Sequence, residues 1–368
     1  TEVRLHAGVS RIGISAFSGC SGRLYAEGTI PNGMDEESGA FYGAKFSDVT
    51  FGSGVAAIGN YAFAGCSTIE KITLPEGLSR VGNYAFKGCK NLSSISVLRG
   101  AKSFGEGAFE GCNAVVKVDI ADIASWCSST FANATSNPLH ISGNIVLNGS
   151  SVTNLEIPDS VTSISAYTFY NCNKLRGVTL PSAIENIGTS AFAGCNNLKG
   201  ITLPSSLKSL GAEAFAGCTG ALVVNCNIAS VTTAKNGAFY GSMFSTATIN
   251  EGVQEVGDYA LYGCSSLGRI TLGRGIKTIG KYAFYGCKGD IEINCAVPSA
   301  ASEAEGLLYG TDFTNVTLGR SVDSIGANVF LGYTGTLIVN CDIPSVATAS
   351  EGAFYGASFT KVVIGNEV

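Results

Sequence analysis

Few side chains in this sequence could carry acid–base or nucleophilic catalysis. The 368 residues include only two histidines, His6 and His140, and neither lies near a candidate serine or cysteine nucleophile in the repeating pattern. We expect both histidines to face solvent. Catalysis by an acid and a base, or by an activated nucleophile, needs titratable groups within hydrogen-bond reach of one another. We therefore predict that the chain is not an enzyme, with no catalytic residues and no cofactor.

The best remaining enzymatic candidate is a pair of carboxylates, Asp119 and Glu156. Both occupy outward positions of the repeat, on neighbouring rungs that flank the one irregular segment. Paired carboxylates can hydrolyse glycosidic bonds. A hydrolase acting through this pair is the third functional hypothesis for the chain.

Thirteen cysteines would ordinarily suggest disulfides or metal ligands. Most of them recur at one position of the repeat: Cys20, Cys66, Cys89, Cys112, Cys172, Cys195, Cys218, Cys264 and Cys287. There is no CxxC pair, and only two imidazoles are present, so no metal site is expected. We predict a ladder of buried thiols that act as small apolar fillers. Disulfides between neighbouring coils, which are about 4.8 Å apart, are the alternative.

Charge and hydropathy exclude two classes of partner. The formal net charge is −5, and the 23 lysines and arginines are scattered along the whole chain. Nucleic-acid binding needs clustered basic residues, so we predict no nucleic-acid partner. No uncharged apolar run approaches the roughly 18 residues that span a bilayer, so no transmembrane segment is expected in this chain.

The elements that carry these side chains are copies of one short unit. Residues 175–195 read LRGVTLPSAIENIGTSAFAGC, and a near-copy follows directly. Apolar residues first alternate, as in a strand, and then step by three and four, as in a turn of helix. A unit this small cannot bury its own apolar side, so copies must stack. We predict one solenoid domain over residues 1–368, with a parallel sheet on one face and short helical or 3-10 coils on the other.

Counting from the middle of each strand gives steps of 23 residues and about sixteen rungs. Alternation along each strand places the counted residue on the open face of the sheet. In the first part of the chain the counted residues are Arg4, Glu27, Thr50, Thr73, Ser96 and Asp119. In the second part, the column that we predict as a candidate binding face contains Thr179, Thr202, Asn225, Thr248, Thr271, Asn294, Thr317 and Asn340.

A second candidate surface lies on the outer coil. Two variants of the repeat alternate toward the end of the sequence, and tyrosines recur in the coils of both. The candidate strip contains Tyr240, Tyr259, Tyr262, Tyr282, Tyr285 and Tyr309. Tyrosine offers a large contact area at low entropic cost. The structural alternative is that these rings only fill space against the adjacent coil.

One segment breaks the rhythm, because the step from Asp119 to Glu156 is 37 residues. We expect Trp126, Cys127, Phe131 and Leu139 to form a small packed outgrowth, and Asn148-Gly149 to turn a hairpin. The segment is either a grafted functional element or a variant repeat with a longer loop.

The pattern LxxIxLPxxLxxIGxxAFxGC, as in residues 198–218, resembles the BspA-like leucine-rich repeats of bacterial and protozoan surface proteins. The resemblance covers essentially the whole chain. It implies a leucine-rich-repeat solenoid, an extracellular or cell-surface location, and a protein or glycan ligand, host matrix proteins among them. The leading functional hypothesis is accordingly a non-enzymatic binding or adhesion protein.

The second hypothesis is a structural spacer without a ligand of its own. Repeat arrays normally end in polar caps, and this sequence opens and closes on strands. We therefore expect the chain to be part of a longer protein or to shield its ends by association.

Overall fold

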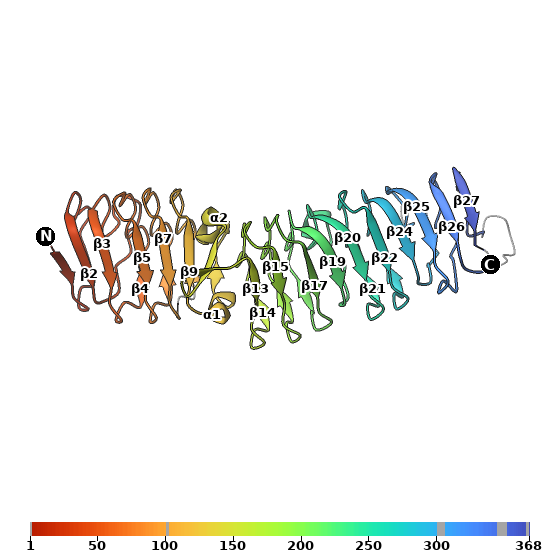
Figure 1. The fold of residues 1–368 in the computed structure, drawn as a ribbon. Coiled ribbons are helices and arrows are strands. Elements are labelled where there is room, and N and C mark those ends of the chain that lie inside the picture. The colour runs from red at the N-terminus through yellow and green to blue at the C-terminus, as the bar shows by residue number, and fades with distance from the viewer. Residues whose placement is uncertain (1, 101–102, 300–305, 344–351, 366–367) are drawn as a thin grey trace. The chain divides into compact units, whose positions relative to one another are not determined.

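A computed structural model describes residues 2–100, 103–299, 306–343, 352–365 and 368. The chain divides into two compact units, Thr1–Leu175 and Arg176–Val368. Each unit is a parallel β-solenoid, in which successive rungs place a strand beside the strand of the rung before (Figure 1). The predicted fold class is thereby confirmed, whereas the single domain over 1–368 stays a prediction.

In the first unit the broad face carries two sheets. The first consists of β1 (Glu2–Leu5), β2 (Ser21–Ala26) and β3 (Lys45–Phe51), and the second of β5 (Lys71–Leu74), β7 (Ser94–Val97), β9 (Lys117–Ile120), β11 (Ile145–Leu147) and β12 (Ser150–Ser151). A third, narrow sheet consists of β4 (Ala57–Ile58), β6 (Arg80–Val81), β8 (Ser103–Phe104) and β10 (Thr130–Phe131). The remaining strands are β13 (Asn154–Glu156) and β14 (Ser163–Ile164).

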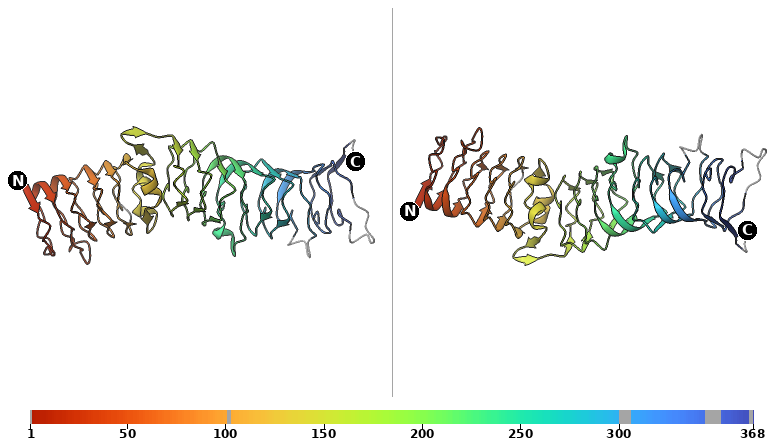
Figure 2. Two further views of the ribbon diagram at one scale, coloured as in Figure 1. Left: turned by 90° about the horizontal axis from the view of Figure 1, so that it is seen from below. Right: turned by 90° about the horizontal axis from the view of Figure 1, so that it is seen from above.

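The second unit carries an eight-stranded parallel sheet. Its strands in order are β17 (Gly200–Leu203), β19 (Thr219–Val224), β20 (Met243–Ile249), β22 (Arg269–Leu272), β24 (Lys288–Ile293), β25 (Asp312–Leu318), β26 (Thr336–Val339) and β27 (Lys361–Ile364). Short strands pair elsewhere on the rungs: β16 (Asn186–Ile187) with β18 (Ser209–Leu210), and β21 (Glu255–Val256) with β23 (Thr278–Ile279). The unit also contains β15 (Gly177–Thr179) and the 3-10 turn η2 (Ala234–Asn236). Figure 2 shows the broad sheet edge-on in two further views.

The strands form because their apolar residues alternate. In β5, Ile72 and Leu74 are buried whereas Lys71 and Thr73 are exposed. A strand points successive side chains to opposite faces, so this pattern puts one face in the core and the other in solvent. The solvent face of each broad sheet is therefore built from the predicted outward positions.

The coil on the other side of each rung is a run of tight turns rather than a helix. In residues 59–66, Ala62, Ala64 and Cys66 donate their N–H groups three residues back, to Gly59, Tyr61 and Phe63. The intervening N–H groups of Tyr61, Phe63 and Gly65 donate to the next rung. An α-helix would need every N–H for bonds four residues back. Stacking thus takes half of the donors, and the remaining bonds are of the 3-10 type, one of the two forms predicted for these coils.

Phenylalanines and thiols form the core behind the sheet. Phe41, Phe63, Phe86 and Phe109 stack with ring centroids 5.0, 5.3 and 5.5 Å apart. Several coil thiols donate to the carbonyl of the phenylalanine one rung before, for example Cys89 Sγ to Phe63 O at 3.2 Å and Cys112 Sγ to Phe86 O at 3.0 Å. The twelve cysteines other than Cys20 are buried, and all thirteen are free thiols. The thiol ladder is confirmed, except that Cys20 is exposed, because the coil of residues 9–20 is covered on one side only.

The strand register departs from a constant step of 23 residues. Thr202 pairs with Val223, 21 residues later, and Val223 pairs with Thr248, 25 residues later. The same short and long steps recur at Thr271, Glu292 and Thr317. The long step contains a bulge, which lies at Gly22/Arg23, Gly220/Ala221 and Gly289/Asp290. The extra residue of the second bulge, Ser245, donates its hydroxyl to Gly220 O at 3.0 Å.

The irregular segment replaces a regular coil with helices. It contains α1 (Ile123–Cys127), the 3-10 turn η1 (Ala134–Ser136) and α2 (Leu139–Ser142). Trp126, Cys127, Phe131 and Leu139 are all buried, as predicted. The predicted hairpin is also present, since β11 and β12 pair antiparallel across Asn148 and Gly149, both of which have positive φ.

Candidate functional site

The predicted column on the open sheet face is in fact two rows. The first, which we call the middle row, contains the paired residues Thr202, Val223, Thr248, Thr271, Glu292, Thr317, Ile338 and Val363. The second, the terminal row, consists of the residue that follows the last paired residue of each strand. It contains Pro204, Asn225, Asn250, Gly273, Asn294, Gly319, Asn340 and Gly365. The backbone ladder continues through the terminal row, because Asn225 N donates to Leu203 O and Gly273 N to Ile249 O.

The prediction therefore assigned three residues to the wrong row. Asn225, Asn294 and Asn340 lie in the terminal row, and the middle row has Val223, Glu292 and Ile338 in their places. The same correction applies to the first unit, where Tyr25 takes the position predicted for Glu27. A shift of two residues along a strand keeps the same side chains on the outer face. The residues predicted to point outward therefore still do so, but their partners on neighbouring strands change.

The predicted threonines do lie on the solvent face. Thr179 and Thr202 are exposed, while Thr248, Thr271 and Thr317 are half-buried. Charged side chains that sequence reasoning missed lie among them: Arg269 Nη2 is 2.6 Å from Glu292 Oε2, and Asn315 Nδ2 donates to Asp290 Oδ1 at 2.7 Å. These polar and paired charged groups share the face with the apolar Val223, Ile338 and Val363.

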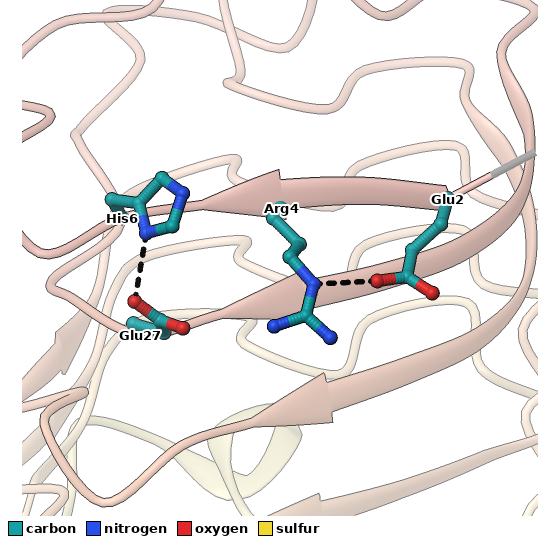
Figure 3. Close-up of polar contacts among 4 residues, drawn as sticks. All are labelled: Glu2, Arg4, His6 and Glu27. Atoms are coloured by element: carbon teal, nitrogen blue, oxygen red, sulfur yellow. Dashed lines mark hydrogen bonds and ion pairs between the residues drawn. The ribbon is translucent and has the colours of Figure 1, made fainter.

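The first strands of the other unit carry a separate charged group, drawn in Figure 3. Arg4 Nε donates to Glu2 Oε1 at 2.6 Å, and His6 Nδ1 lies 2.9 Å from Glu27 Oε2. The Arg4 guanidinium also lies 5.3 Å from the centre of the Tyr25 ring. The side chain of His6 is 71% exposed, which confirms its predicted orientation toward solvent.

Five of the six predicted tyrosines form one continuous strip of rings. Tyr259 stacks on Tyr282 at 5.3 Å and Tyr262 on Tyr285 at 4.9 Å. Tyr309 contacts both Tyr282 and Tyr285, at 5.9 and 6.0 Å. All six tyrosines, Tyr240 included, are half-buried. Because the rings cover one another's faces, the strip offers mainly ring edges and hydroxyls to a partner.

His140 and the two predicted carboxylates have different surroundings. His140 is half-buried, contrary to the prediction, because α2 turns it inward and its Nδ1–H donates to Asn137 O at 2.7 Å. Burial lowers the pKa of His140, opposed by this hydrogen bond. Asp119 Oδ1 accepts from Gly149 N at 3.2 Å and so holds the hairpin, while Glu156 is exposed on β13. A hydrolase acting through this pair stays a hypothesis.

The buried thiols are unreactive at neutral pH. Burial raises the pKa of Cys66 to about 12 and that of Cys226 to about 11. A thiol acts as a nucleophile or metal ligand in its thiolate form, so such groups are inert at neutral pH. Within the part of the chain that the structure describes, no three His, Cys, Asp or Glu side chains are grouped to hold a metal ion.

A pocket of about 300 Å³ opens at the end of the second unit's sheet. It is lined by Thr248, Ile249, Asn250, Glu251, Thr271, Gly273, Arg274, Asn294 and Ser321. Three of these residues belong to the predicted column. Sequence reasoning could not find the pocket, because it depends on the terminal row, which the constant step had merged with the middle row.

The repeats match a known family along nearly the whole chain. The BspA type leucine-rich repeat region matches residues 1–115, 34–147, 140–268, 192–295 and 301–368. The chain belongs to the BspA-type leucine-rich repeat family.

Three solved structures of bacterial proteins are similar to this chain. A leucine-rich repeat protein from Bacteroides ovatus is 18% identical, covers 98% of this chain and 91% of its own, and has a TM-score of 0.50. One from Eubacterium ventriosum is also 18% identical, with 93% and 92% coverage and a TM-score of 0.37. The pneumococcal vaccine antigen PcpA is 15% identical, with 94% and 79% coverage and a TM-score of 0.39. At such identities the first match bears on the fold alone.

Two further comparisons bear on the class of protein. Curated protein sequences gave no match to this BspA-type chain. No helix in the described ranges combines the length and the apolar character that a bilayer crossing requires. Leucine-rich repeats serve in general as scaffolds for protein interaction, so the function has to be argued from the surfaces above.

Proposed function

We propose that this BspA-type chain is a non-enzymatic, extracellular binding protein that engages a protein or glycan through the open sheet face of β17–β27. The observation that carries the proposal is the pair of parallel rows on that sheet, which present threonine hydroxyls and asparagine amides beside the pocket at Gly273. A rigid backbone ladder fixes these groups, so a ligand would meet them already ordered.

The sheet face suits this role better than the tyrosine strip does. The tyrosine rings stack face to face, so their faces are covered. The hydroxyls of Thr248, Thr271 and Thr317, by contrast, make no hydrogen bond within the described chain. Unused hydroxyls on a solvent face are available to a partner without breaking internal contacts. The family's association with cell surfaces supports an extracellular location and host matrix proteins as one class of partner.

The test is binding of the purified protein to a panel of extracellular-matrix proteins and to a glycan array. The double variant Thr202→Arg/Thr317→Arg places two long cations on the sheet face, outside the pocket lining. Ser266→Arg, on an exposed coil residue, is the matched control. We expect the double variant to lose binding at least ten-fold and the control to bind as the parent does.

Two results would overturn the proposal. If the parent protein binds nothing on either panel, the chain is better described as a spacer. If Ser266→Arg or loss of the tyrosine rings reduces binding while the sheet-face variant does not, the outer coil is the binding surface.

A further inference from the structure

The three described glycines of the terminal row differ in their nearest neighbours. A Cβ built on Gly319 would lie 1.8 Å from Asn294 Oδ1, and one on Gly365 would lie 2.5 Å from Asn340 Oδ1. The preceding asparagine therefore covers each of these two glycines. At Gly273 the nearest atoms are backbone only, from Ile249, Asn250 and Glu251.

A pair of asparagines orients one residue of the pocket lining. Asn250, which lines the pocket, donates from Nδ2 to Asn225 Oδ1 at 2.7 Å. Asn225 is itself held by a hydrogen bond from its Nδ2 to Leu203 O at 3.0 Å. The side chain of Asn250 is thus fixed by the strand before it, beside the pocket at Gly273.

Polar groups with free hydrogen-bonding capacity line this pocket. The hydroxyls of Thr248, Thr271 and Ser321 have no internal partner among the described residues. The lining carries one cation and one anion, and these neutralise each other, because Arg274 Nε and Nη2 both donate to Glu251 Oε1, at 2.9 and 2.7 Å. No aromatic residue lines the pocket.

We infer that the pocket at Gly273 is a subsite for one neutral sugar residue. Each hydroxyl of a sugar both donates and accepts, which matches a lining of hydroxyls, amides and a balanced ion pair. A phosphate or sulfate would need unpaired cations, and the only cation in the lining is already paired. An extended peptide offers one donor and one acceptor per residue along a line, whereas these groups converge on one compact space of about 300 Å³.

This inference rests on the proposed function, since it names the ligand class for the same face. The direct test is titration of the protein with neutral monosaccharides: glucose, galactose, mannose, xylose and N-acetylglucosamine. Binding is measured by calorimetry and by chemical-shift changes. We expect at least one of them to bind in the millimolar range. Failure of the inference and of the proposed function are distinguishable, because the matrix panel and the monosaccharide titration are separate measurements.

Matched variants locate the sugar. Thr271 lines the pocket, whereas the exposed coil residue Ser266 lies outside the lining. Thr271→Arg should therefore abolish monosaccharide binding, whereas Ser266→Arg should leave it unchanged. Asn225→Ala, which lies outside the lining, should weaken binding about five-fold, because the amide of the lining residue Asn250 loses the partner that orients it.

The outcomes decide between the alternatives. Monosaccharide binding that Thr271→Arg removes and Ser266→Arg keeps supports the sugar subsite. Binding to matrix proteins with no response to any monosaccharide overturns the subsite and leaves the proposed function standing. Sugar binding that is insensitive to Thr271→Arg places the sugar elsewhere and also overturns it.

Discussion

Asn250 donates a hydrogen bond from Nδ2 to Oδ1 of Asn225, across a distance of 2.7 Å between neighbouring strands. The two residues are 25 apart in sequence, whereas a constant repeat would separate equivalent positions by 23. The bond therefore depends on the short and long steps of the register. Because Asn250 lines the pocket at Gly273, the bond links the strand register to the pocket.

Thiol labelling in the native state should detect Cys20 alone. Cys20 is exposed and the other twelve cysteines are buried. We expect one fast equivalent with a small thiol reagent at neutral pH, and thirteen after unfolding in denaturant. Cys20→Ser should remove the fast phase. Fewer than thirteen thiols in the unfolded, unreduced protein would instead indicate disulfides.

The protein should lose stability steeply at alkaline pH. Burial raises the pKa of Cys66, Cys127 and Cys264 to about 12, above the value of about 8.5 for a free thiol. Above pH 8.5 the native state then binds more protons than the unfolded state, so the free energy of unfolding falls as pH rises. Each such thiol removes about 1.4 kcal/mol per pH unit between about pH 9 and the native pKa.

Urea midpoints measured from pH 7 to pH 10 test the alkaline effect. We expect little change up to about pH 8 and a steep fall beyond pH 9. A variant with Cys66→Ala should show a shallower fall than the parent. A midpoint that stays constant to pH 10 would contradict burial of the thiols.

The bulge glycine should be intolerant of any side chain. Gly220 has φ of +87°, and an added Cβ would lie 2.1 Å from the carbonyl carbon of Lys199. Gly263 has φ of +74°, but nothing lies within 4 Å of its added Cβ. Gly263→Ala should cost about 1 kcal/mol, which is the strain of the left-handed region alone.

Gly220→Ala should cost several times that strain, because backbone must also move. Chemical denaturation of both variants makes the comparison within one unit of the chain. Equal costs for the two substitutions would mean that the bulge is not fixed as described.

The tyrosine strip should contribute to stability through its rings and not its hydroxyls. Tyr285 stacks on Tyr262 and lies over Gly310, whose added Cβ would be 2.2 Å from the ring. Tyr285→Ala should cost about 2 kcal/mol, whereas Tyr285→Phe should be nearly neutral. A large cost for the phenylalanine variant would show that the hydroxyl has a structural partner.

The first unit should be destabilised by mild acid through His140. Burial lowers the pKa of His140, so the unfolded state binds the proton more tightly than the native state does. The free energy of unfolding should then fall as pH drops below about 6.5. His140→Gln should remove this component, and an unchanged acid profile in that variant would contradict it.

The fold was predictable because its signal is repeated many times. Alternating apolar residues and the Ala-Phe-Gly-Cys coil set the solenoid, and the buried Phe63 and Cys66 occupy the positions that the pattern assigns. The alignment of the sheet face was not predictable from that pattern. Val223 and Asn225 both point outward, so a slip of two residues leaves the apolar alternation unchanged.

The two-residue shift in strand register does leave a signal in the sequence, in the spacing between the coil cysteine and the following strand. Thr202 lies seven positions after Cys195, whereas Val223, the residue that pairs with Thr202, lies five positions after Cys218. The pocket has no comparable signal. Its lining comes from several rungs that become neighbours only when the strands align in the folded sheet.

The alternation of short and long steps also bears on how such a chain could lengthen over generations. Thr271 and Thr317 enclose one short step and one long step, and together these restore the spacing of two ordinary rungs. A tandem duplication or a deletion that copies both rungs would leave every flanking ladder in phase. Loss of a single member would put all later strands two residues out of phase, so inherited changes in length should come in pairs of rungs.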